Sequence, residues 1–181
     1  TPPNPQPTGW YGRSVATDGN TIVIGMPKLD GKNGNNVGGV FVYEKVDGRW
    51  KSEPSEKFEG LAEGDEFGYA VGVSGDTIVV GAPGRDLDES KNVGAVYTLQ
   101  RRNGKWRAPS DSASLLGLPA GLQPRQRFGR SVAIDEDVVA VGAPGIFQQK
   151  MGQAYVYERD SKNFNWGAPI SLIPPDTVVK L

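Results

Sequence analysis

The chain has 181 residues, of which 37% are hydrophobic, enough for one domain with a sizeable core. Its 20 basic and 21 acidic side chains nearly cancel, so its net charge provides no general attraction to nucleic acid. Cysteine and histidine are both absent, which excludes disulfides, thiolate and imidazole catalysis and the commonest transition-metal ligands.

The chain opens with the proline-rich stretch TPPNPQPTG. We interpret residues 1–10 as an extended polyproline arm or a linker, with Trp10 outside the repeat pattern that follows. The longest apolar runs, such as TIVIG and DVVAVGA, have the length of a strand, so the sequence predicts no membrane span.

Three similar segments then follow one another, starting at Tyr11, Phe67 and Phe128. They read YGRSVATDGNTIVIGMP, FGYAVGVSGDTIVVGAP and FGRSVAIDEDVVAVGAP. The aromatic residue that opens each segment lies 16 residues before a proline and 38 or 39 residues before a tryptophan: Pro27, Pro83 and Pro144, then Trp50, Trp106 and Trp166. Repeats of this size predict stacked supersecondary units.

Each unit is predicted to contain four antiparallel strands. A strand such as RSVA turns at Asp18-Gly19, Ser74-Gly75 or Asp135-Glu136 into a run such as TIVIG, which is apolar on both faces and therefore expected to be buried on both. A third strand, GVFVYE in the first unit, ends in the hairpin signals DGRW and NGKW, and the tryptophan opens a more polar fourth strand. We expect little or no helix. The predicted units are 11–66, 67–127 and 128–173, followed by a tail, 174–181.

Four-stranded antiparallel units are typical of β-propeller blades, so the fold class is all-β with three blades, a partial or assembled propeller. The pattern FG…SVA…VGAP…GAVY resembles the FG-GAP repeat of integrin α-subunit propellers. This resemblance implies an extracellular or cell-surface location and binding of proteins or matrix. In integrin blades that bind calcium, an Asp-rich loop joins the SVA and VGAP strands. Here that connection is too short to surround an ion, so the calcium site is not transferred.

The loops after the three prolines vary in length and charge, and we expect specificity to lie there because a rigid scaffold lets loops vary. Candidate partner-binding residues are Asp30, Asn33, Asn35, Asp86, Asp88, Glu89, Phe147 and Gln148. Asp86, Asp88 and Glu89 are also weak candidates for calcium, because hard cations prefer oxygen ligands at alternating positions. The alternative is a solvated polar loop, with no cofactor.

No catalytic residues are assigned. The carboxylates at Glu63, Asp65 and Glu66 are neighbours on a turn and do not face each other across a cleft, as a glycosidase requires. The recurring aromatics indicate packing between blades, or else slots for sugar rings. They are Phe41, Tyr97 and Tyr155, with the three repeat tryptophans.

Three blades cannot close a ring of face-packed sheets, so we expect the two end faces to be covered by further blades or by other subunits. The sequence therefore favours a non-enzymatic scaffold or adhesion module whose partners are other proteins or further copies of itself. A carbohydrate-binding propeller and an accessory domain of a secreted hydrolase are the alternatives.

Overall fold

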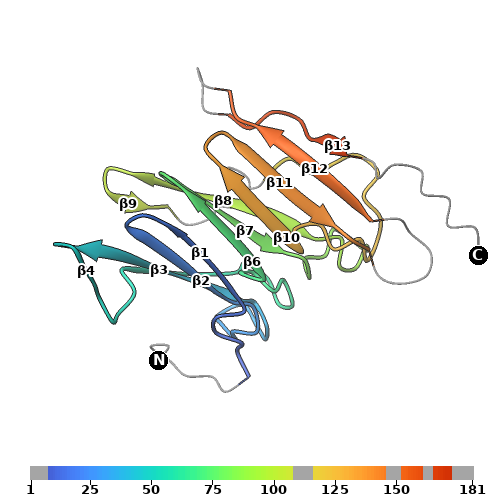
Figure 1. The fold of residues 1–181 in the computed structure, drawn as a ribbon. Coiled ribbons are helices and arrows are strands. Elements are labelled where there is room, and N and C mark those ends of the chain that lie inside the picture. Colours follow the sequence, from blue (N-terminus) through green and yellow to red (C-terminus); the bar gives the residue numbers. More distant parts are fainter. Residues whose placement is uncertain (1–7, 108–115, 146–151, 161–164, 173–181) are drawn as a thin grey trace, which may run out of the picture.

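The computed structural model describes residues 8–107, 116–145, 152–160 and 165–172, and within them it contains strands and no helix. The strands form three antiparallel sheets that follow one another in chain order, with the second sheet in the middle (Figure 1). The all-β, blade-type prediction is confirmed. We call the three sheets blades 1, 2 and 3.

Blade 1 contains β1 (Ser14–Asp18), β2 (Thr21–Met26), β3 (Gly39–Val46), β4 (Arg49–Trp50) and β5 (Glu56–Glu59). Blade 2 contains β6 (Ala70–Ser74), β7 (Thr77–Ala82), β8 (Ala95–Arg102) and β9 (Lys105–Trp106). Blade 3 contains β10 (Ser131–Asp135), β11 (Val138–Ala143), β12 (Gln153–Glu158) and β13 (Ile170–Leu172). The fourth position of blade 1 is shared by β4 and β5, which pair with opposite ends of β3.

The hairpins between the third and fourth strands form where DGRW and NGKW predict them. In blade 1 the turn residues Asp47 and Gly48 both have positive φ, 50° and 73°, and Asn103 and Gly104 repeat this in blade 2. Two consecutive residues with positive φ match the right-handed twist of the flanking strands, which is why Asp-Gly and Asn-Gly are favoured there.

The hairpins between the first and second strands turn one residue later than predicted. Asp18 pairs with Thr21, so the loop residues are Gly19 and Asn20. The Asp18 carboxylate accepts a hydrogen bond from the backbone N–H of Gly75 in blade 2. Its side chain therefore links two blades.

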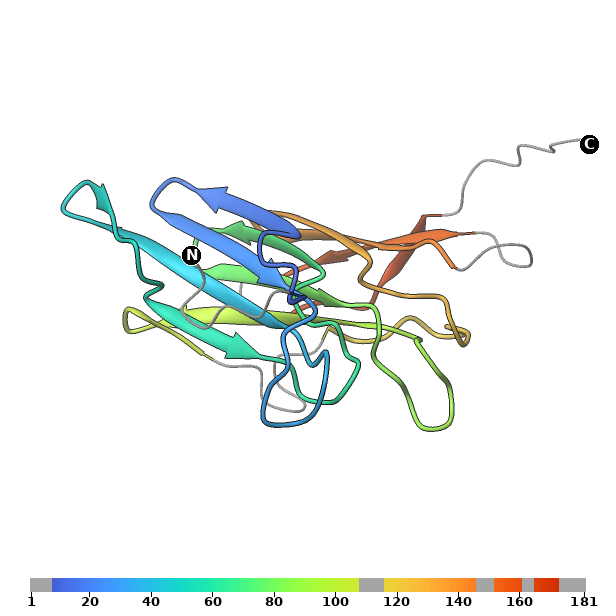
Figure 2. The same ribbon diagram turned by 90° about the horizontal axis from the view of Figure 1, so that it is seen from below.

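We call the side of a blade directed toward the next blade in chain order its front face and the opposite side its rear face. The front of blade 1 packs on the rear of blade 2, and the front of blade 2 packs on the rear of blade 3 (Figure 2). The core between blades 1 and 2 joins front-face residues such as Val23 and Val42 to rear-face residues such as Val71 and Ile78. The core between blades 2 and 3 repeats this arrangement with Val79 against the rear of blade 3. Alternation along each strand sends neighbouring side chains to opposite cores.

Glycine at the VGAP position allows successive blades to approach closely. A Cβ atom built on Gly25 would lie 2.0 Å from the carbonyl oxygen of Gly68, and one on Gly81 would lie 1.9 Å from that of Gly129. These carbonyls belong to the Phe-Gly pair of the following blade. The repeat therefore needs glycine in both places because backbone occupies the space of a side chain.

The prediction that all three second strands are buried on both faces holds only for the middle blade. Every residue of β7 is buried, whereas β11 alternates between exposed and buried positions and β2 between half-buried and buried ones. The physical reason is position in the stack: β7 has a blade on each side within the described residues, and β2 and β11 have one.

Candidate functional site

The loops after Pro27 and Pro83 are two β-hairpins with the same geometry. In the first, Gly31 and Gly34 exchange backbone hydrogen bonds of 3.1 and 3.3 Å. In the second, Leu87 and Ser90 do so at 3.0 and 2.8 Å. Two residues form each tip, Lys32-Asn33 in one and Asp88-Glu89 in the other, so the frame is shared while the tip chemistry differs.

An aspartate closes the base of each hairpin. Asp30 Oδ1 accepts the backbone N–H of Asn36 at 2.9 Å, and Asp86 Oδ1 accepts that of Asn92 at 2.7 Å. Asn36 and Asn92 have φ of 51° and 52°, a left-handed conformation that asparagine tolerates. We call this contact the aspartate clasp.

The asparagine of each clasp also fixes its hairpin to the next blade, through its backbone carbonyl. The carbonyl oxygen of Asn36 accepts the N–H of Glu66 at 3.1 Å, and that of Asn92 accepts the N–H of Arg127 at 3.1 Å. Each hairpin is therefore anchored on two blades. A loop held at its base in this way presents its tip on a rigid support.

Asp86 makes a second contact, 2.7 Å from the Lys91 ammonium. Slight burial raises the pKa of Asp86, but the hydrogen bonds from Lys91 and from the Asn92 N–H outweigh it and lower that pKa overall. The carboxylate is therefore held in its ionised form to lower pH than an ordinary aspartate. Its oxygens serve the clasp and this ion pair.

Trp10, Glu66 and Arg127 occupy one equivalent position, immediately before the aromatic-glycine pair of each blade, with φ of 59°, 56° and 57°. Trp10 is thus part of the repeat, contrary to the sequence interpretation. The chemistry of this position changes from aromatic to acidic to basic along the stack. Because the three residues are unlike, only the spacing to the (F/Y)G pair could have revealed their equivalence.

We call the edge of the stack that carries the two hairpins the loop edge. Lys28, Glu66 and Arg127 form a charged row along it, with Trp10 at one end. Lys28 pairs with Glu66, whose other oxygen lies 3.4 Å from the Arg127 guanidinium. The Lys28 ammonium also lies 5.6 Å from the centre of the Trp10 indole, a cation–π distance. The row connects all three blades at the edge that carries the hairpins.

A second ion pair lies beneath this row. Asp65 is buried and its carboxylate accepts a hydrogen bond of 3.2 Å from Arg85. Burial raises the pKa of Asp65, and the opposing effect of Arg85 and of the Ala62 N–H does not cancel this shift. Asp65 and Glu66 therefore have separate cationic partners, and the carboxylates of this turn serve the junction between blades.

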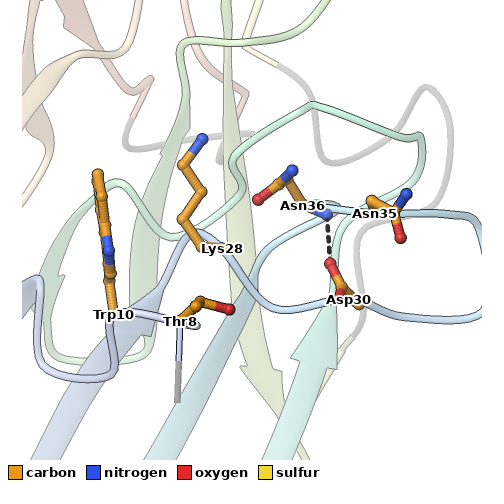
Figure 3. A pocket seen from close by; sticks show the side chains of 6 residues that line it. All are labelled: Thr8, Trp10, Lys28, Asp30, Asn35 and Asn36. Carbon is orange, nitrogen blue, oxygen red and sulfur yellow. Dashed lines mark hydrogen bonds between the residues drawn. The ribbon is translucent and has the colours of Figure 1, made fainter. Parts of the chain in front are cut away.

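A hollow of about 450 Å³ lies at the base of the first hairpin. Figure 3 shows the side chains that line it. Trp10 stands at one side of it, with Lys28 next to it and Asp30 and Asn36 across the hollow, joined by their hydrogen bond. The indole is 53% exposed. Six residues line the hollow: Thr8, Trp10, Lys28, Asp30, Asn35 and Asn36.

The structure brings some predicted loop residues together and separates others. Asp30 and Asn35 line the hollow, while Asn33 is exposed at the tip of the first hairpin. Asp86, Asp88 and Glu89 lie on the second hairpin, and no group of three acidic side chains in the described part of the chain could hold a metal ion. Phe147 and Gln148 lie outside the described residues.

Most of the recurring aromatic side chains pack against other rings of their own blade or against the preceding blade. Phe67 meets Tyr97 edge-to-face at 5.5 Å, and Phe128 meets Tyr155 at 5.7 Å. Trp106 is 3% exposed, and its indole N–H donates to Glu44 of blade 1 at 3.3 Å. Trp50, the equivalent residue of blade 1, is 42% exposed.

Three repeated units with a shared aromatic-glycine junction are thus established from the geometry. A family model described as the FG-GAP repeat matches residues 1–43, 59–99 and 119–157, more than half of the chain. The chain belongs to the FG-GAP repeat family. A search of curated proteins finds no significant match.

The three matched FG-GAP segments correspond to the three blades, and each contains the aromatic-glycine pair and the second strand of its blade. The described residues contain no helix that is long and apolar enough to cross a membrane. FG-GAP repeats are typical of extracellular proteins.

Proposed function

We propose that this FG-GAP chain is a non-enzymatic, extracellular scaffold or adhesion module that binds other proteins through its loop edge. The observation that supports this most directly is the pair of clasped hairpins. Two frames of the same geometry present Lys32-Asn33 and Asp88-Glu89 from adjacent blades, anchored by the same bonds. Rigid support lowers the entropy that a loop loses on binding, and different tips supply specificity.

The test is an adhesion assay on surfaces coated with the chain, using a panel of matrix proteins and cultured cells. We expect binding that falls at least tenfold in the tip variants Lys32→Ala/Asn33→Ala or Asp88→Asn/Glu89→Ala. Ala62→Arg, a change at an exposed position on the turn before blade 2, serves as the control. Binding that is unchanged in both tip variants would refute the loop-edge proposal.

The hollow beside Trp10 favours carbohydrate as a second candidate ligand. An exposed indole can stack on the apolar face of a sugar ring, and Asp30, Asn35 and Asn36 supply hydrogen-bonding groups nearby. We expect a glycan bound here to be lost in Trp10→Ala and retained in Trp50→Ala, which changes an exposed tryptophan elsewhere. A broad glycan panel without binding at high protein concentration would exclude this candidate.

A further inference from the structure

The front face of blade 3 exposes positions that are buried in the other two blades. Val138 is 44% exposed, whereas its equivalents Thr21 and Thr77 are buried. Leu172 is 49% exposed, whereas its equivalent Leu116 is buried. The remaining apolar side chains of this face are Ala133, Ala140, Ala154, Val156 and Ile170.

The same face contains a hollow of about 370 Å³. It lies at the position where blade 1 receives the aromatic-glycine pair of blade 2. Its lining includes Ser131, Gly142 and Gly152. In blade 1 the equivalent residues are Ser14, Gly25 and Gly38, and they receive Phe67-Gly68 of blade 2. There the Ser14 hydroxyl donates to the Gly68 carbonyl oxygen at 2.8 Å, and Gly38 forms a bridge with Phe67. The hollow on blade 3 is therefore a socket for an aromatic-glycine pair.

The rear face of blade 1, at the opposite end of the stack, has no neighbouring blade among the described residues; Met26 and Phe41 on this face are buried, while Tyr11 and Tyr43 pack against them. Val15 is 66% exposed, whereas its equivalent Val71 is buried in the core between blades 1 and 2. A Cβ atom on Gly12 would meet nothing within 4 Å, whereas one on Gly68 would lie 2.4 Å from the carbonyl oxygen of Gly39. Trp50 is exposed, and Trp106 is covered by blade 1. This end therefore carries an aromatic-glycine pair, Tyr11-Gly12, without a socket among the described residues.

The polar groups at the two ends also match. Glu44 of blade 1 accepts hydrogen bonds from Arg101, at 2.8 Å, and from Trp106 of blade 2. By register, Glu158 is the equivalent of Glu44, and Lys45 and Trp50 are the equivalents of Arg101 and Trp106. Glu158 is exposed at one end of the stack, and Lys45 is exposed beside Trp50 at the other.

We propose that the front face of blade 3 binds the rear face of blade 1 of a second copy of this chain, reproducing the internal junctions. Tyr11-Gly12 of the second copy enters the socket, and the Ser131 hydroxyl donates to the Gly12 carbonyl. Glu158 accepts from Lys45 and Trp50, and Asp135 accepts the Gly19 N–H as Asp18 accepts that of Gly75. This assembly goes beyond the loop-edge function and does not depend on it.

When the front face of one copy binds the rear face of another, the pair still has one free front face and one free rear face. Such a contact uses all the faces only when the copies form a closed ring. Two copies supply six blades, within the four to eight with which propellers close. The structure therefore points to a closed pair with two equivalent junctions. The loop-edge hairpins remain outside both junctions.

The test is light scattering of the intact chain over a range of concentrations. We expect a species of about 39 kDa, twice the 19.4 kDa of one chain, that dissociates on dilution. Ala140→Arg blocks the front face of blade 3, and Val15→Glu blocks the rear face of blade 1. Both residues are exposed in the single chain, so the variants are expected to fold, which circular dichroism checks. Ala62→Arg is the matched control and should still dimerise.

The two blocked variants together discriminate between modes of association. Each alone should shift dimerisation to at least tenfold higher concentration, and a mixture should form a heterodimer through the one intact junction. Loss of the dimer in Ala140→Arg but not in Val15→Glu would indicate a front-to-front contact and overturn the proposal. A wild-type chain that stays monomeric at every concentration, or one that grows without limit, would also overturn it.

Charge reversal tests the register of the junction. Glu158→Lys and Lys45→Glu should each weaken dimerisation several-fold, and the double variant should recover most of the loss. Loop-tip variants should have no effect on the mass, so failure of the assembly and failure of the adhesion proposal are distinguishable. A double variant that dimerises less well than either single variant would refute the proposed register.

Discussion

At the residue scale, glycines and short polar side chains determine how close two blades can come. The hydroxyl of Ser14 is a hydrogen-bond donor in the junction between blades 1 and 2, where its partner is a backbone carbonyl. At the next junction Ala70 takes the place of Ser14, so the approach of the blades there depends on the glycines and the apolar core. The repeat thus tolerates loss of this hydrogen bond but retains the glycine.

Gly81→Ala tests that requirement. The new Cβ atom would lie 1.9 Å from the Gly129 carbonyl oxygen, which is backbone and cannot rotate away. We expect the free energy of unfolding to fall by about 3 kcal/mol, at the upper end for overpacking. Urea denaturation measures it, with Gly117→Ala as the control, because a Cβ atom there meets nothing within 4 Å. Equal losses in both variants would contradict this account.

Tyr157 provides a test of pH dependence. Its buried hydroxyl donates to the Gly117 carbonyl at 2.7 Å, and burial raises its pKa above the ordinary value of 10.0. Because the unfolded chain loses this proton at lower pH, the stabilising contribution is complete below pH 10 and is lost as pH rises through the folded pKa. We expect Tyr157→Phe to reduce the slope of the stability loss above pH 10 by up to about 1.4 kcal/mol per pH unit. An unchanged slope would show that Tyr157 ionises equally in both states.

At the element scale, the two hairpins on the loop edge differ in their tip residues but are held at the base by the same aspartate–asparagine contact. The clasps of Asp30 and Asp86 have the same geometry although the intervening residues differ. The asparagines that close them also bond to the next blade. Each hairpin is therefore stabilised by the junction beneath it, which couples loop order to blade packing.

Asp86→Ala should release the second hairpin without unfolding the blade. We expect amide exchange of Asn92 to accelerate at least tenfold, because its N–H loses the carboxylate at 2.7 Å, while global stability changes by less than about 1 kcal/mol. Hydrogen exchange followed by NMR measures this, and Asp88→Asn, at the tip, is the control. Because the pKa of Asp86 lies below the ordinary value of 3.8, only a pH well below 3.8 should have the same effect in the wild type, where protonation weakens the clasp. Unaltered protection of Asn92 in the variant would show that the clasp does not hold the loop.

At the scale of the whole molecule, three similar units experience different environments because of their place in the stack. Blade 2 packs on both sides and contributes to both large cores, while blades 1 and 3 each have one open face. In a stack of this kind, stability is the sum of the unit terms and the nearest-neighbour junctions. The middle blade should therefore be the last to open.

Native-state hydrogen exchange should reveal this gradient. In dilute solution, where the chain is a single copy, we expect the slowest exchange in β7 and β8 and exchange at least a hundredfold faster in β1 and β13. At concentrations where the proposed pair forms, β1 and β13 should become protected as well. Uniform protection in dilute solution would show that the three blades unfold as one unit.

The sequence alone determined the repeat, its strands and its hairpins, because periodicity and turn chemistry are local properties of the chain. It identified Asp30 and Asp86 only as polar loop residues, and it placed Trp10 outside the repeat. The tertiary structure decided these points: clasps, blade faces and the charged row arise from contacts between residues far apart in sequence. The burial of Trp106 and the exposure of Trp50 illustrate the difference. The two residues have the same place in the motif, and only the presence of a preceding blade distinguishes them.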